Sequence, residues 1–521
     1  MSRLNRPTLG ALFLVAIATY FSALKNQFPL DDAVILAHPL IQSLRTLPGA
    51  LVSPWWYATN RLYRPFTLAS FAVERAVVGP APVYPHAVNI VLHALAVVLL
   101  ACLLARFLPP IGAVAGALVF AVLPAHAEAV ASIVGRAELL SAIALIALML
   151  VVTGDNPPSR RDRFLACLLS AIALASKESG AAAPALVFAA AWARPNQRPF
   201  AARWVVSAAV GTVALLAARL AVLGTLGGEM RNPVFRAVTD GERIRLALAM
   251  IPRSTEMLLL PVRPAIDYVP ALIQLHHPAS WAVVLGLTLV VAVAAAMVFH
   301  LRRPSAAGLG AWITAATLAP TANLLFAGGV LLAGRTLYSP SLGAAFVVGA
   351  IVARIATGRR VWPVRAAVGV LVVISASVTW REAAVWRSSE TVIAEMQVRH
   401  PEDYRSFSHL GYTARDHGND AEAVKQFRQA AERFPGDPEM LTDAATVALR
   451  LHDTTTARAW LEQAIAVSPR AARGRTRLMS ILLAKGDTAG ARRLLMEGLE
   501  REPSQETWAK ELRALGGPIE K

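Results

Sequence analysis

Hydrophobic residues gather in long continuous runs over the first 380 residues of this chain. Eleven such runs are long enough to cross, or nearly cross, a bilayer. They lie at about 8–24, 86–105, 111–124, 138–153, 165–176, 180–193, 204–223, 281–300, 308–320, 340–356 and 364–380. A perpendicular span needs about 20 apolar residues, so some of the shorter runs are candidates for re-entrant or interfacial helices. The pattern predicts an all-α, polytopic membrane helix bundle with about eleven spans.

From Tyr404 onward the pattern becomes a repeat with a period of 34 residues. A proline ends each unit, a large apolar residue and an alanine recur in the second helix, and Gly418, His452 and Gly486 mark the turns between helices. The recurring positions are Pro435, Pro469 and Pro503; Phe427, Leu461 and Leu495; and Ala423, Ala457 and Ala491. This spacing is typical of a tetratricopeptide solenoid. We therefore predict a membrane domain at 1–380, a linker or first helix at 381–403, and about three repeats at 404–521.

Charge changes at the same place along the chain. Residues 381–521 carry 21 basic and 21 acidic side chains, which leaves 30 basic against 13 acidic in residues 1–380 and puts the whole net charge of +17 there. Basic residues between apolar runs are expected in cytoplasmic loops, so no nucleic-acid partner is indicated. A chain that is 55% hydrophobic and 16% charged is not a purely soluble enzyme.

Arginine clusters give an independent prediction of orientation. If the N terminus is cytoplasmic, every cluster falls in an inner connection. The clusters are Arg3 and Arg6; Arg106; Arg160, Arg161 and Arg163; Arg194, Arg198 and Arg203; Arg302 and Arg303; and Arg354, Arg359, Arg360 and Arg365. The segments expected on the outer side are then the loop 25–85, the turns near 126, 177 and 335, the segment 224–280 and the repeats. Arginine outnumbers lysine 45 to 6, a bias typical of a GC-rich bacterium, so we expect a multi-pass protein of the bacterial plasma membrane.

Asp31 and Asp32 form the only adjacent acidic pair in residues 1–380, and they follow the first apolar run directly. A carboxylate at the membrane edge can act as a general base, and a second one beside it can orient the first or hold a cation. Capping of a helix that begins at Ala33 is the alternative, because Asp is a favoured capping residue.

The later outer turns also carry charged side chains in apolar surroundings. Ionisable residues at membrane depth are costly, and this cost favours a functional role. The charged or ionisable residues of these turns are His126, Glu128, Arg136, Glu138, Lys177, Glu178 and Arg335, and Tyr338 follows three positions after Arg335. Lys177 and Arg335 suit an anionic head group. Snorkelling, or simple pairing such as Lys177 with Glu178, is the alternative.

These motifs resemble, in order, the transmembrane and tetratricopeptide repeat-containing O-mannosyltransferase family, whose members have the C-type membrane glycosyltransferase fold. The resemblance covers nearly the whole chain. The matching segments are Asp31-Asp32, Tyr63-Arg64-Pro65-Phe66-Thr67, His86 to His93, Leu123 to Val130, Val134 to Glu138, Ser176-Lys177-Glu178 and Ala333 to Tyr338, followed by the repeats.

The resemblance implies a polyprenyl-phosphate sugar as donor, a mannose-like hexose as the sugar, and transfer with inversion to a hydroxyl of a protein or glycan acceptor. By this resemblance Asp31 or Asp32 is the base, and Lys177, Arg335, Arg64 and Arg136 are candidates for the donor phosphate. The other expected cavity residues are Tyr63, His126, Glu128, Glu138, Glu178 and Tyr338. No cofactor is indicated, and a divalent metal is left open because metal use differs within this fold. Membrane lipid surrounds the site.

The short repeat array departs from the long arrays of the animal members, which leaves the acceptor open. A short solenoid can bind a peptide or protein partner or pack on the outer loops. Two other functions stay open. A lipid-linked polymer ligase or polymerase would place its chemistry in residues 224–280, and a non-enzymatic scaffold would depend on the repeats alone.

Overall fold

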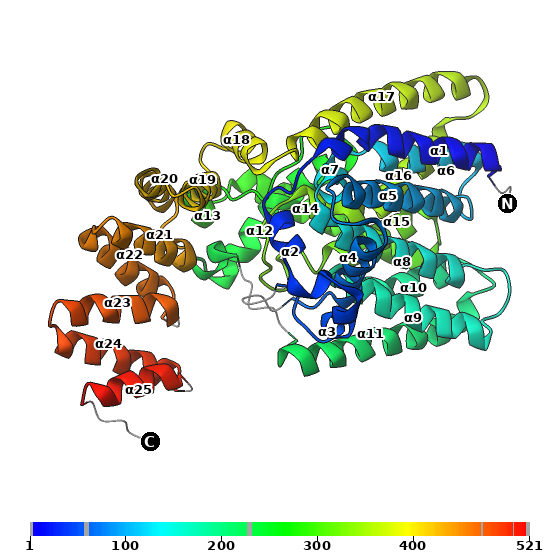
Figure 1. Ribbon diagram of the computed structural model, residues 1–521. Helices are drawn as coiled ribbons and strands as arrows, with labels where there is room; N and C mark the ends of the chain where they lie inside the picture. Colours follow the sequence, from blue (N-terminus) through cyan, green and yellow to red (C-terminus); the bar gives the residue numbers. More distant parts are fainter. Residues whose placement is uncertain (1–3, 57–61, 227–231, 470–471, 504, 517–521) are drawn as a thin grey trace. The chain divides into compact units, whose positions relative to one another are not determined.

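Every regular element of the described chain is a helix, as predicted. The computed structural model describes residues 4–56, 62–226, 232–469, 472–503 and 505–516, and within them strand pairing is limited to a single antiparallel bridge between Tyr268 and Leu332 (Figure 1). The chain forms two compact units. Unit 1 comprises Met1–Met230, Ile244–Tyr268 and Pro278–Val392, and unit 2 comprises Arg231–Arg243, Val269–His277 and Ile393–Lys521. The domain limits expected at residues 380 and 404 stay a prediction.

Unit 1 contains the apolar helices. Its longer helices are α1 (Arg6–Tyr20), α4 (Pro65–Val78), α5 (Val83–Leu104), α6 (Pro110–Val122), α8 (Arg136–Val152), α9 (Arg160–Ser176), α11 (Ala201–Leu223), α14 (Ser280–Arg302), α15 (Ala306–Leu318), α16 (Tyr338–Ile355) and α17 (Val361–Val385). Its short helices are α2 (Asp31–Leu36), α3 (Leu47–Leu51), α7 (Ala127–Ala131) and α10 (Ala183–Trp192). Two helices, α12 (Asp240–Leu259) and α18 (Ser389–Arg399), run from one unit into the other.

Seven helical segments of the described chain are long and apolar enough to cross a membrane, or eight if a bent pair counts as one span. The seven are Arg6–Lys25, Val83–Leu104, Ile133–Val152, Arg198–Leu223, Gln274–Arg302, Gly334–Ile355 and Gly358–Val385, and the bent pair is Pro110–Val122 with Pro124–Ala131. The chain is thus a multi-pass membrane protein by its apolar helices. The expected number of about eleven spans is too high on this measure. The three remaining apolar runs do form helices, but α10 has 10 residues, α15 has 13, and α9 begins with Arg160-Arg161-Asp162-Arg163.

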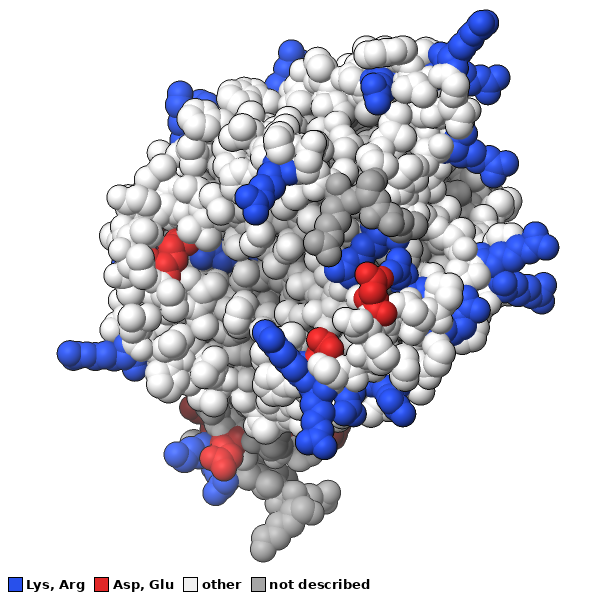
Figure 2. All heavy atoms as spheres, turned by 90° about the vertical axis from the view of Figure 1, so that its right-hand side faces the viewer, with Lys and Arg blue, Asp and Glu red and all other residues white. Residues whose placement is uncertain are grey.

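The loops that carry the arginine clusters gather at one end of the bundle in unit 1. Arg106 donates to Thr153 Oγ1 over 2.7 Å, and Arg194 pairs with Asp155 at 2.5 Å. The connections α8–α9 and α16–α17 lie at the same end, on the right of Figure 1. Figure 2 looks at that side, where Lys and Arg lie both at the margin and over the face and outnumber Asp and Glu. Arg3 of the first cluster lies outside the described residues. This arrangement is what the predicted orientation requires of the inner face.

Small residues allow α6 and α16 to approach closely. A Cβ atom added at Gly112 would lie 2.5 Å from the carbonyl oxygen of Gly349, and one added at Gly116 would lie 2.4 Å from that of Ala345. Helices in membranes associate through such small-residue contacts because lipid provides no hydrophobic drive for their association. The contact brings the N-terminal end of α16, where Tyr338 lies, beside the bend at Pro124 between α6 and α7.

Unit 2 contains the helical repeats, and this part of the prediction is confirmed. Its helices are α13 (Leu272–His276), α19 (Tyr404–Asp416), α20 (Asp420–Arg433), α21 (Pro438–Arg450), α22 (Thr454–Val467), α23 (Ala472–Ala484), α24 (Thr488–Arg501) and α25 (Glu506–Ala514). The repeated alanines and large apolar residues are fully buried. Gly418, His452 and Gly486 all have positive φ, between 60° and 77°, so the turn between paired helices is the same in each copy.

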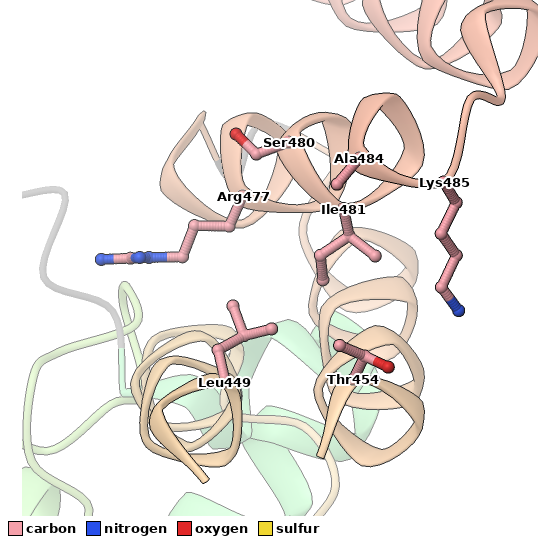
Figure 3. Close-up of a pocket in the computed structure, with 7 residues that line it drawn as sticks. All are labelled: Leu449, Thr454, Arg477, Ser480, Ile481, Ala484 and Lys485. Carbon is pink, nitrogen blue, oxygen red and sulfur yellow. The ribbon is translucent and has the colours of Figure 1, made fainter. Parts of the chain in front are cut away.

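A groove of about 310 Å³ opens on the repeats between α21, α22 and α23 (Figure 3). Leu449 and Thr454 point toward Ile481 of α23, and these side chains form its floor and walls. Arg477 and Lys485 stand at its two sides. The groove is therefore apolar inside and basic at its margins.

Candidate functional site

The site lies in unit 1, where the predicted outer turns converge at the end of the bundle opposite the arginine loops. The first loop covers this end with a small core of its own. Trp55 and Phe71 lie at the centre of that core, and Ile35 of α2 packs in the same cluster as Ile133. Burial of these apolar groups fixes α2 against the turn that precedes α8.

Asp32 is fully buried and accepts hydrogen bonds from the turn that precedes α8. The Ser132 hydroxyl donates to its carboxylate over 2.8 Å, and the N–H groups of Ile133 and Val134 donate over 2.9 Å each. Burial raises the pKa of Asp32 to about 7, and these three donors act in the opposite direction. Both oxygens of the carboxylate are thus engaged in hydrogen bonds to the turn, so the contacts of Asp32 favour a structural role.

Asp31 is exposed, in contrast to its neighbour. Leu30, the residue before it, has φ 47°, a conformation that a bulky residue rarely adopts, and its N–H donates to Ser389 Oγ over 3.0 Å. The segment is held further by Gln27, whose N–H donates to the Arg387 carbonyl over 2.8 Å. The chain is therefore turned and fixed so that the first carboxylate of the pair faces outward.

Arg335 lies within electrostatic reach of Asp31. Its guanidinium pairs with Glu128 Oε1, and the backbone N–H of Arg335 donates to Glu128 Oε2 over 3.1 Å. A second carboxylate, Asp267, lies 3.9 Å from Nη2 of the guanidinium. Two anions from separate segments thus hold the cation within electrostatic reach of the exposed carboxylate.

Lys177 and Arg64 bring two further positive charges to the same place. The Lys177 ammonium lies 3.0 Å from Glu138 Oε1, and it is close enough to Arg64 and Arg335 for their charges to act on it. Arg64 binds Glu178 through two bonds of 3.2 and 2.7 Å. Burial raises the pKa of Glu178, but the Arg64 and Lys177 charges outweigh it and lower that pKa to about 2.

Arg136 has different surroundings from the other expected phosphate ligands. It is completely buried, where it pairs with Glu74, donates to Asn89 Oδ1 over 2.9 Å and lies over the ring of Phe71. Tyr63 donates its hydroxyl to the Leu51 carbonyl over 2.7 Å. These contacts suggest that Arg136 and Tyr63 stabilise the first loop. Their expected roles in the site stay predictions.

His126 and Tyr338 lie in a buried aromatic cluster below the charged groups. The His126 ring is 4.5 Å from the Tyr338 ring between centroids, and its Nε2 atom is 2.7 Å from Ser341 Oγ. The Tyr338 hydroxyl lies 2.8 Å from His93 Nδ1. The cluster packs the inner wall of the site and fixes the start of α16, which begins three residues after Arg335.

Sequence reasoning missed Asp267. It lies in the outer segment 224–280, two residues after Ala265, and has φ 44°. A single acidic residue between Pro264 and Pro270 was the available signal, because prolines restrict the conformation of the chain on both sides of it. Within the described residues, no group of three or more His, Cys, Asp or Glu side chains is arranged to hold a metal ion.

Known proteins with related sequences are protein O-mannosyl-transferases. The mouse protein O-mannosyl-transferase TMTC3 is 23% identical over 489 residues, which cover 84% of this chain and 52% of that protein. The Caenorhabditis elegans protein O-mannosyl-transferase F38B6.6 is 25% identical over 81% of this chain and 62% of its own length. The Drosophila melanogaster Tmtc1 protein is 35% identical over 144 residues, or 26% of this chain and 17% of its own.

This chain is a homologue of the protein O-mannosyl-transferases. It spans about half the length of the mouse relative. The homologues are glycosyltransferases by name, in agreement with the resemblance of the sequence motifs. No family model matches the chain. Among solved structures, the first tetratricopeptide repeat domain of Spaghetti (RPAP3) matches with a TM-score of 0.20 and 20% identity, over 22% of this chain and 94% of that one.

Proposed function

We propose that this O-mannosyl-transferase homologue transfers a hexose, with mannose as the first choice, from a polyprenyl-phosphate donor to an acceptor hydroxyl at the outer face of the membrane. One observation carries the proposal. The exposed carboxylate of Asp31 lies within electrostatic reach of Arg335, and Arg335 lies within reach of Lys177 at the same end of the apolar bundle. We choose mannose because the relatives are named protein O-mannosyl-transferases.

The proposed reaction uses the carboxylate and the cations in one step. Asp31 takes the proton of the acceptor hydroxyl as its oxygen forms a bond to the anomeric carbon. The bond between that carbon and the phosphate oxygen breaks, and the electron pair leaves with the polyprenyl phosphate. Arg335 and Lys177 stabilise the charge on this leaving group. Attack opposite to the leaving group inverts the anomeric centre.

The lipid donor explains the placement of the cations. A polyprenyl chain stays in the bilayer, so its phosphate must meet positive charge where apolar helices end. Lys177 follows α9 directly, and Arg335 precedes α16. Each is paired with glutamate, which keeps the cation fixed before the donor arrives. Arg64 and Glu178 form a further pair beside them.

The test uses purified protein in lipid with a panel of polyprenyl-phosphate sugars. We expect the mannosyl donor to be consumed or transferred, and Arg335→Gln to raise the KM for that donor. Arg194→Gln, which removes a cation from the arginine end of the bundle, is the matched control and should leave the KM unchanged. Equal effects of the two substitutions, or no turnover of any donor by the natural protein, would contradict the proposal.

A protein acceptor is the partner that we assign to the groove on the repeats. Arg477 and Lys485 flank the apolar side chains of Leu449 and Ile481, so the groove fits an acidic segment that also presents an apolar side chain (Figure 3). Reversing both charges, with Arg477→Glu and Lys485→Glu, should weaken transfer to a protein acceptor without changing consumption of the donor. Loss of both activities, or of neither, would contradict this assignment.

The orientation follows from the same proposal. With the arginine loops in the cytoplasm, the site and the repeats face the outside of a bacterial plasma membrane. Gathering of the arginine loops at one end of the apolar bundle supports this orientation.

A further inference from the structure

The loop between α15 and α16, residues 319–333, which we name the apolar loop, contains no charged residue. The loop 25–85 and the segment 224–280 both carry charges of either sign. The apolar loop instead exposes two large apolar side chains at its tip, where Leu325 is 71% exposed and Phe326 is 56% exposed. Apolar surface of this kind is unfavourable in water and favours contact with an apolar partner.

The side chain of Asn323 closes the apolar loop across its neck. Its Nδ2 atom donates to the Val330 carbonyl over 2.9 Å and to the Thr321 carbonyl over 3.2 Å, and its Oδ1 atom accepts the N–H of Gly328 over 2.7 Å. Asn323 is buried and has φ 58°, a conformation that asparagine adopts more readily than most residues. The loop is therefore held in one shape, with Leu325 and Phe326 presented at its tip.

Both ends of the apolar loop lie at about the level of Arg335. Helices α15 and α16 pack side by side, and the Thr314 hydroxyl of α15 donates to the Pro340 carbonyl of α16 over 3.1 Å (Figure 1). Beyond Thr314, α15 continues for four residues and ends at Leu318. On the neighbouring chain, Thr336 lies four residues before Pro340. Because helical residues rise by similar steps, Leu318 and the segment around Arg335 are level with each other.

The apolar loop also borders both of the cations that we assign to the donor phosphate. Its first end leaves α15, which packs against the turn Glu178–Ala182, and this turn begins directly after Lys177. Its other end continues through residues 331–334, all of them buried, into Arg335. The loop thus begins beside the segment that follows Lys177 and ends at Arg335.

We propose that the apolar loop binds the polyprenyl chain of the donor through Leu325 and Phe326. The inference rests on the proposed function, which places the donor phosphate at Arg335 and Lys177. The first isoprenoid units of a chain attached to that phosphate then lie next to the loop that borders both cations. The tip offers them apolar surface, and Asn323 fixes it before the donor arrives, so that little conformational entropy is lost on binding.

The test compares two exposed phenylalanines and two donors. Phe326→Ser removes apolar surface from the tip, whereas Phe299→Ser removes it from a side chain of similar exposure, 53%, near the arginine end of α14. The donors are polyprenyl-phosphate mannoses with a long chain and with a single isoprenoid unit. We expect Phe326→Ser to raise the KM for the long-chain donor about tenfold, with a smaller change for the short one, and Phe299→Ser to change neither.

A conservative variant and a second readout separate lipid binding from folding. Phe326→Leu keeps an apolar side chain and should retain most of the affinity for the long-chain donor. For the second readout, a photoreactive phenylalanine analogue replaces Phe326 or Phe299 in protein reconstituted in phospholipid with labelled polyprenyl phosphate that carries no sugar. We expect the label to be captured at position 326, and this capture to fall when unlabelled polyprenyl phosphate is added. Position 299 should capture phospholipid alone.

The outcomes distinguish this inference from the proposed function. If the natural protein turns over no donor, the proposed function fails, while capture at position 326 still decides whether the apolar loop binds polyprenyl phosphate. Capture of phospholipid alone at position 326 would show that the tip contacts bulk lipid and would overturn the inference. Equal effects of Phe326→Ser and Phe299→Ser on the KM, or equal effects of Phe326→Ser on the two donors, would also overturn it.

Discussion

At the scale of single residues, the two adjacent carboxylates of the first loop meet opposite surroundings. Asp32 accepts three hydrogen bonds inside the fold, whereas Asp31 is exposed near Arg335. Successive residues on a helix point in different directions, so one of a pair can be buried while the other is free to react. Of the two candidates for the base, we therefore propose Asp31.

Asp31→Asn is expected to lower kcat for transfer by about 10²–10⁴-fold, because it removes the proposed general base. Its thermal unfolding temperature should match that of the natural protein, since the side chain is exposed. Asp32→Asn is the matched comparison. Its amide keeps one oxygen but places an NH2 group against the backbone N–H of either Ile133 or Val134, because these two groups donate to different oxygens of Asp32, so we expect the free energy of unfolding to fall by about 1–3 kcal/mol.

Transfer assays and thermal unfolding of both variants in detergent measure these effects together. The expected pattern is loss of rate without loss of stability for Asp31→Asn, and loss of stability for Asp32→Asn. A variant at Asp31 with the natural rate would mean that the base lies elsewhere.

The pKa of Asp32 predicts a dependence of stability on pH. Burial raises it to about 7 from an ordinary value of 3.8, so the folded protein binds this proton more tightly than the unfolded chain does. The stability that Asp32 contributes should therefore be complete below the ordinary value and be lost as the pH rises through about 7. Glu178, with a pKa of about 2, stays ionised throughout that range.

Thermal unfolding of the natural protein and of Asp32→Asn between about pH 5 and pH 8 tests this sign. The difference between the two should shift in favour of the natural protein as the pH falls. Because other titrating groups are shared by both proteins, they cancel in the difference. A difference that does not change with pH would show that Asp32 does not titrate in this range.

Side chains that carry charge could be found from the sequence, but their partners could not. Lys177 stood out as an ion in apolar surroundings, and pairing with its neighbour Glu178 was the simple alternative. In the structure Lys177 pairs with Glu138, and Glu178 pairs with Arg64. Asp267 was missed because its role depends on Arg335, which is 68 positions further along the chain. Such pairs are set by packing of distant segments, which composition and spacing do not encode.

At the scale of elements, hydropathy placed every apolar helix but overestimated how many are long enough to span. All eleven predicted runs lie in helices, and α9, α10 and α15 fall short in length or apolar character. The bend of 47° at Pro124 also follows from local chemistry, because proline lacks the N–H that continues a helix. Contacts between helices could not be predicted in the same way. Glycines occur throughout the apolar runs, and the sequence does not show which of them lie where two helices approach closely.

Packing of α6 against α16 gives a prediction at this scale. Gly349→Leu should destabilise the protein by about 1–3 kcal/mol, because even a Cβ atom there would lie 2.6 Å from the Gly112 carbonyl oxygen. Gly369→Leu on α17 is the matched control, since no atom lies within 4 Å of a Cβ at that position. Thermal unfolding in detergent should separate the two variants. Equal unfolding temperatures would show that the close approach of α6 and α16 does not contribute to stability.

At the scale of the whole molecule, the sequence divides into an apolar part and a repeat part, and the structural unit that contains the repeats also includes two segments from between the apolar runs. Segments Arg231–Arg243 and Val269–His277 of the outer stretch belong to the unit that contains the repeats. The 34-residue period predicted the repeat helices and their turns because each copy uses the same local contacts. No period marks the inserted segments, so their place in the fold depends on tertiary contacts such as that of Val269 with Asp403.

Orientation in the membrane is the prediction that concerns the molecule as a whole. In a background with Cys102 and Cys167 replaced by alanine, we place single cysteines at exposed positions in the two regions, as Ser480→Cys in the repeats and Asn156→Cys in the loop after α8. A maleimide that cannot cross the membrane should label Ser480→Cys in intact cells and Asn156→Cys only after permeabilisation. The arginine loops are expected inside because Lys and Arg accumulate in cytoplasmic loops. Labelling in the reverse order would place the carboxylate and its cations on the cytoplasmic side and exclude transfer at the outer face, whereas labelling of both sites in intact cells would show that the segments between them cross the membrane an even number of times.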